Sequence, residues 1–162
     1  SQTETEEKQK ASIRGLHILL VEDNELNMEI AEFMLQNEGA YVTKAWNGQE
    51  AVEIFEKSKS DEFDVILMDI MMPVMNGYEA TKMIRSLDRD DAKKIPIIAM
   101  TANAFTEDRI RAKEAGMDEH LSKPIVIDEV IKTILRYVHF DKELPNTDSG
   151  KSIGGFSEGT GK

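Results

Sequence analysis

Hydrophobic and polar residues follow two different periods along the central part of the chain. Short apolar runs predict buried strands, whereas apolar residues that recur every three or four positions predict amphipathic helices. We expect strands at 16–21, 40–45, 64–69, 95–101 and 118–123. We expect helices at 25–39, 48–58, 77–87, 106–116 and 128–138. Strands and helices therefore alternate strictly along the sequence.

This alternation predicts an α/β fold in which a parallel sheet carries helices on both faces. The runs 16–21, 64–69 and 95–101 are apolar on both sides, which is typical of central parallel strands. The run 40–45 alternates and the run 118–123 is mostly polar, so we place these two strands at the edges. The expected architecture is a single-domain, doubly wound, flavodoxin-like (βα)5 sheet with strand order 2-1-3-4-5.

Length and composition agree with one domain. The chain has 162 residues, of which 40% are hydrophobic and 31% charged, enough for one well-buried core. We expect the domain to span 15–140, between a polar N-terminal linker (1–14) and a flexible tail rich in glycine and serine (141–162).

Charge and cysteine content narrow the environment and the partners. A net charge of −11 opposes binding to nucleic acid or to an anionic membrane surface. The chain has no cysteine and no long apolar segment, so we expect a cytoplasmic location, even if a parent protein is anchored in a membrane.

Polar residues gather where the predicted strands end. Glu22 and Asp23 follow the first strand, Asp69 ends the third, Thr101 ends the fourth and Lys123 ends the fifth. Each has an ordinary structural explanation by itself; Asp23, for example, could cap the next helix. Because the carboxyl ends of parallel strands meet at one edge of a sheet, together they predict a functional site.

The residue types point to phosphoryl chemistry. Neighbouring carboxylates without cysteine or paired histidines suit a hard cation such as Mg²⁺, with Mn²⁺ as a substitute. Asp69 is placed as a carboxylate nucleophile that accepts a phosphoryl group. Lys123 and the Thr101 hydroxyl would hold the phosphoryl oxygens.

Four sequence blocks resemble the receiver domain of two-component response regulators. They are "ILLVEDNELN", "DVILMDIMMPVMNGYEATKMIR", "IPIIAMTANAF" and "GMDEHLSKPI", in order and properly spaced between 16 and 138. The combination of "VEDNELN", "MTANAF" and "SKPI" is most similar to receivers of hybrid sensor histidine kinases. A free-standing single-domain response regulator is the alternative.

The resemblance implies a role for each site residue. Asp69 would be the phospho-acceptor, and Glu22 and Asp23 would bind Mg²⁺ together with Asp69 and the backbone carbonyl of Met71. Lys123 would pair with the phosphoryl group, and its bond to Pro124 would be cis. The donor would be a phosphohistidine on a histidine kinase or a histidine phosphotransfer domain. The receiver would catalyse only its own phosphorylation and dephosphorylation, although a hybrid parent would be a histidine kinase.

The resemblance also implies a switch on phosphorylation. The family often has Tyr or Phe three residues before the active-site lysine, where this sequence has His120. We expect Thr101 to move toward the phosphoryl group and His120 to pack inward behind it. The face formed by 106–116, 118–123 and 128–138 would change, and could support a weak homodimer.

The helix at 25–39 has more apolar residues than a core-facing side needs. Its apolar positions sweep roughly 220°, about twice the width of a surface helix's apolar stripe. The surplus, chiefly Leu26 and Phe33, predicts a docking surface for the histidine-bearing partner.

Two other functions are less compatible with the sequence. A haloacid-dehalogenase-like phosphatase needs a second acid two residues after its nucleophile, and that position is Met71. In a flavodoxin-like electron carrier, Glu22 and Asp23 would repel the flavin phosphate.

Overall fold

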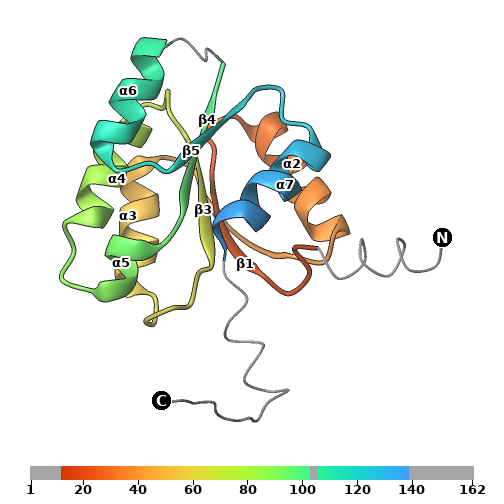
Figure 1. Cartoon of the computed structure of the whole chain (residues 1–162), viewed down its shortest axis with the longest axis horizontal. Coiled ribbons are helices and arrows are strands. Elements are labelled where there is room, and N and C mark those ends of the chain that lie inside the picture. Colours follow the sequence, from red (N-terminus) through yellow and green to blue (C-terminus); the bar gives the residue numbers. More distant parts are fainter. Residues whose placement is uncertain (1–11, 103–105, 139–162) are drawn as a thin grey trace, which may run out of the picture.

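A computed structural model describes residues 12–102 and 106–138. It contains a five-stranded parallel sheet in the order β2-β1-β3-β4-β5 (Figure 1). The strands are β1 (His17–Val21), β2 (Tyr41–Ala45), β3 (Val65–Asp69), β4 (Ile97–Thr101) and β5 (Glu119–Ser122). The predicted doubly wound fold and strand order are confirmed, with the alternating and the polar strand at the edges.

Helices cover both faces of this sheet (Figure 1). They are α2 (Glu25–Asn37), α3 (Gly48–Lys57), α4 (Gly77–Arg85), α5 (Asp90–Lys94), α6 (Thr106–Ala115) and α7 (Ile127–Tyr137). Figure 1 shows α2 and α7 on one face and the other helices on the opposite face. The short helix α5 was not predicted, because its sequence DDAKK has a single apolar residue, Ala92, and therefore no readable period.

The sheet separates two hydrophobic cores. On one face, Leu19 and Val21 of β1 pack with side chains such as Phe55 of α3. On the other, Leu20 packs with residues of α2 and α7 such as Leu35. Strand residues of β3 are buried on both faces, as the unbroken apolar run predicts. Packing on both faces holds the strands in place, and therefore also the residues at their carboxyl ends.

The ends of the elements differ slightly from the sequence predictions. β4 begins at Ile97 rather than at 95, and β5 covers only 119–122. The predicted tail at 141–162 and most of the predicted linker at 1–14 lie outside the described residues. Among the residues that are described, no helix combines the length and the apolar content that crossing a membrane requires.

Candidate functional site

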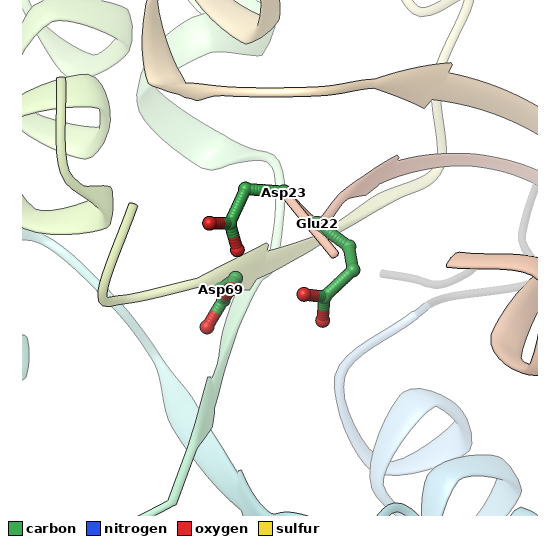
Figure 2. A group of neighbouring side chains, drawn as sticks. All are labelled: Glu22, Asp23 and Asp69. Atoms are coloured by element: carbon green, nitrogen blue, oxygen red, sulfur yellow. The ribbon is translucent and has the colours of Figure 1, made fainter. Parts of the chain in front are cut away.

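Three carboxylates meet where β1 and β3 end. Glu22 and Asp23 follow β1 and Asp69 ends β3, and Figure 2 shows their side chains grouped together. One ligand oxygen from each lies within 4.8 Å of the others. Glu22 and Asp69 are only 3% and 4% exposed, whereas Asp23 is exposed. The sequence-predicted acidic cluster is therefore assembled in the fold.

The start of α2 fixes the Glu22 side of this cluster. Asn24 is the N-cap, and its side chain accepts a hydrogen bond from the Asn27 N–H at 2.9 Å. The Asn24 backbone N–H donates to Glu22 Oε2 at 3.1 Å. Asn24 rather than Asp23 thus caps the helix, so capping does not account for the Asp23 carboxylate.

Lys123 extends from the end of β5 into the carboxylate cluster. Its Nζ lies 2.8 Å from Glu22 Oε1 and 3.0 Å from Asp69 Oδ1. Its backbone N–H donates to the Thr101 carbonyl at 2.8 Å, which ties β5 to the end of β4. The Lys123–Pro124 bond is cis, as the resemblance implied. Lys123 is therefore an integral part of the site and not a solvated surface lysine.

The electrostatics of the cluster favour a bound cation. Burial and the nearby Glu22 carboxylate raise the pKa of Asp69 to about 7, even though Lys123 lowers it. Burial opposes the charged form of Lys123, but its bonds to Glu22 and Asp69 raise its pKa. One ammonium does not balance three carboxylates, so the site retains excess negative charge. Hard oxygen donors with uncompensated charge fit a divalent ion such as Mg²⁺.

Thr101 and Met71 complete the predicted set at this edge. Thr101 ends β4 and is 8% exposed. Met71 lies two residues after Asp69, in the loop between β3 and α4, and its side chain is 77% exposed. The loop runs close to α4, because the Gly77 N–H donates to the Ile70 carbonyl at 2.8 Å. A Cβ at Gly77 would overlap the Asp69 carbonyl oxygen, so only glycine fits there.

His120 lies on β5 and outside the carboxylate cluster. Its side chain is 23% exposed, and its Nδ1 is 3.6 Å from Glu119 Oε2. It lines two pockets beside β5, one shared with Arg136 of α7 and the other with Arg109 of α6. The residue thus lies at the centre of the face that the sequence predicts to respond to phosphorylation.

The outer face of α2 carries an apolar stripe. Leu26 is 65% exposed and Phe33 68%, which confirms the predicted surplus. Ile30, 46% exposed, lies between them at helical spacing and was not singled out from the sequence. Beside Ile30, a cavity of about 320 Å³ opens between α2 and the segment after β5, with Ile125 and Lys123 in its lining.

The fold and site together define a class of protein: a doubly wound sheet with an acidic cluster and a lysine at its carboxyl edge. The family model for the response regulator receiver domain matches residues 18–135. The chain belongs to this family.

Histidine kinase 1 of Arabidopsis thaliana is 37% identical over 158 residues, covering 79% of this chain. Hybrid signal transduction histidine kinase G of Dictyostelium discoideum is 41% identical over 133 residues, covering 81%. The chain spans 13% and 4% of the lengths of these two relatives.

Solved structures show the same fold. The receiver domain of sensor histidine kinase PA1611 from Pseudomonas aeruginosa PAO1, with magnesium coordinated in its active-site cleft, is 41% identical with a TM-score of 0.69. The match covers 76% of this chain and 97% of that one. A co-crystal structure of the Saccharomyces cerevisiae phosphotransfer protein Ypd1 and the receiver domain of Ssk1 matches at 30% identity and a TM-score of 0.69, covering 78% and 90%.

Proposed function

We propose that this receiver domain accepts a phosphoryl group from a phosphohistidine onto Asp69 and changes conformation as a result. The observation that carries the proposal is the placement of a buried Asp69 carboxylate 3.0 Å from the Lys123 ammonium. Glu22 and Asp23 lie beside it with ligand oxygens in reach. A nucleophile, a fixed cation and a metal-ligand set are thus assembled in one place.

The proposed transfer uses groups of this chain at each step. An Asp69 carboxylate oxygen forms a bond to phosphorus while the bond between phosphorus and the donor imidazole nitrogen breaks. The imidazole leaves with the electron pair of that bond. Lys123 and the Thr101 hydroxyl bind phosphoryl oxygens. Mg²⁺, or Mn²⁺ in its place, would be held by Glu22, Asp23, Asp69 and the Met71 carbonyl, where it offsets negative charge on the phosphoryl group.

The aspartyl phosphate would later be hydrolysed by water. The domain thereby catalyses its own phosphorylation and dephosphorylation, and no other reaction is proposed. Similarity to receiver regions of histidine kinases supports a hybrid histidine kinase as the parent, with a free-standing response regulator as the alternative. In either case we place this domain in the cytoplasm.

Incubation with Mg²⁺ and a small phosphoramidate tests the proposal. We expect the intact mass of the protein to increase by a single phosphoryl group, and the increase to require the metal ion. Absence of any adduct under conditions that phosphorylate a control receiver domain would contradict the proposed function.

We propose that the apolar stripe Leu26, Ile30 and Phe33 docks the histidine-bearing partner. Helical spacing places Glu25 and Glu29 along one side of this stripe. A third acid on that side, Glu32, pairs with Lys44 at 3.4 Å. The matching surface on the partner would therefore have an apolar centre bordered on one side by Lys or Arg side chains. Because α2 begins two residues after Asp23, a partner helix that packs on this stripe would bring the partner's histidine close to the site.

Replacing Leu26 and Phe33 by serine should slow phosphotransfer from a phosphorylated histidine phosphotransfer protein by about tenfold or more, which corresponds to about 1.4 kcal/mol of lost docking energy. Phosphorylation by a small phosphoramidate should be unchanged, because the small donor needs no docking surface. Ile110→Ser on α6, which changes a similarly exposed apolar residue, is the matched control. Equal loss with both donors would contradict docking on α2.

We propose that Thr101 and His120 form the switch, in which movement of Thr101 toward the phosphoryl group lets His120 pack inward. His120→Ala should reduce the difference in partner binding between the phosphorylated and unphosphorylated forms, and His120→Tyr should retain it. His17→Ala, at an exposed histidine on β1, is the control. Unchanged binding by both His120 variants in both states would contradict the assignment. The same face of α6, β5 and α7 could support a weak homodimer.

A further inference from the structure

The loop between β3 and α4 is tied to the rest of the domain at two points. At its base, the hydrogen bond from the Gly77 N–H to the Ile70 carbonyl closes the loop. Near its far end, the Gly48 N–H, at the start of α3, donates to the Met75 carbonyl at 3.1 Å. Met71, whose carbonyl is a proposed metal ligand, lies between these two attachments.

Gly48 lets α3 approach this loop unusually closely. A Cβ at position 48 would overlap the Met75 carbonyl oxygen and would lie 3.0 Å from the Met75 carbonyl carbon and from its Cγ. Gly48 does not have a positive φ, so its backbone conformation is open to other residues. Glycine is therefore required here because of the close contact and not because of its backbone conformation. A larger residue would have to displace the Met75 backbone.

The loop also contains a strained residue. Val74 is β-branched yet has a φ of 71°, a conformation that such residues rarely adopt. The Met75 N–H donates to the Pro73 carbonyl at 2.7 Å across it, the hydrogen-bonding pattern of a γ-turn. Val74 is 81% exposed, so its own packing does not hold this conformation. Strain of this kind persists where surrounding hydrogen bonds impose it. The nearest such bonds are the two at Met75, one from its N–H to Pro73 and one to its carbonyl from Gly48.

We propose that Gly48 is a positioning residue for the metal site. Its bond to Met75 holds the strained loop in place, and the loop in turn presents the Met71 carbonyl to Mg²⁺. Gly48 itself touches neither the metal nor the phosphoryl group. The inference rests on the proposed function for the identity of the metal ligands. It implies that the turn between β2 and α3 contributes to the affinity of the site for Mg²⁺.

Calorimetric titration with Mg²⁺ alone tests this role in the Gly48→Ala variant. The added methyl group displaces the Met75 carbonyl, so we expect Mg²⁺ affinity to fall by about tenfold or more, as when outer partners of metal ligands are removed. Asn47→Ala is the matched control, because the Asn47 side chain caps α3 through the Glu50 N–H. Its loss weakens the same turn without adding an atom against Met75. We expect this control to lose thermal stability and to retain its Mg²⁺ affinity. Equal affinity in Gly48→Ala and wild type, or equal losses in both variants, would overturn the proposal.

Amide hydrogen exchange in the wild-type protein gives a test that does not depend on a variant folding. If the Gly48–Met75 bond supports the metal site, Mg²⁺ must stabilise that bond in return. Exchange of the Gly48 amide should therefore slow several-fold when Mg²⁺ is added. The Ser58 amide, which donates to Phe55 at the other end of α3, should not change. An unaffected Gly48 amide in a protein that binds Mg²⁺ contradicts the positioning role, whereas failure to bind Mg²⁺ at all contradicts the proposed function.

Discussion

Without magnesium, the Asp69→Asn variant is expected to be more stable than the wild-type protein at pH 8. Asp69 is buried beside Glu22, and these surroundings raise its pKa from 3.8 to about 7. At pH 8 the folded wild type must therefore hold a carboxylate that its environment disfavours. Asparagine has nearly the same shape and no charge, so the substitution removes this cost.

The same pKa shift fixes how the stability difference depends on pH. Between pH 4 and pH 7 the folded protein binds a proton at Asp69 that the unfolded chain has already released. The stability that Asp69 contributes to the folded protein is thus fully present below the pKa of the unfolded chain, and it is lost as pH rises through the pKa of the folded protein. The stability of the variant relative to that of the wild type should therefore rise across this window, by about 1.4 kcal/mol per unit of pKa shift and on the order of 4 kcal/mol in all.

Urea unfolding of both proteins in a chelator, from pH 4 to pH 8, measures this difference. Asp88→Asn is the control, because Asp88 is an exposed carboxylate in the connection between α4 and α5, and its substitution should leave the pH profile unchanged. Added Mg²⁺ should stabilise the wild type more than Asp69→Asn. A wild type that is already the more stable protein at pH 8 without metal would contradict the electrostatic description of the site.

The sequence predicts the fold well because the apolar periods that distinguish strands from helices are local and recur along the chain. β3 is apolar on both faces and lies centrally, whereas the alternating run at 40–45 and the polar run at 118–123 contain the edge strands β2 and β5. The site follows from the same pattern, since Asp69 and Lys123 end strands of one parallel sheet. Once the strand order is known, these charged residues have to share an edge.

Other parts of the site depend on contacts between distant segments and leave no periodic signal. No pattern in the sequence relates Gly48 to Met75 or indicates that one lysine ammonium pairs with both Glu22 and Asp69. The sequence offered Asp23 as a possible cap of the next helix, although Asn24 beside it is an equally good capping residue. Only the geometry assigns the cap to Asn24 and leaves Asp23 for the cluster.

Phosphorylation should be lost completely in Asp69→Asn, which is the second large effect that we expect. The neutral amide oxygen is a poor nucleophile and would not yield a stable acyl phosphate. Neighbouring Glu22 and Asp23 are not expected to replace Asp69 as the acceptor, because Asp69 alone ends the central strand β3. Asp88→Asn should retain full phosphorylation and serves as the control for a substitution of the same kind elsewhere.

The most direct test of the account is to locate the phosphoryl group after incubation of the wild-type protein with Mg²⁺ and a small phosphoramidate. Intact-mass measurement and peptide mapping should find a single phosphoryl group on the peptide that contains Asp69, and no adduct in Asp69→Asn. A phosphoryl group that maps to another residue, or that persists in Asp69→Asn, would contradict the central claim that Asp69 is the phospho-acceptor.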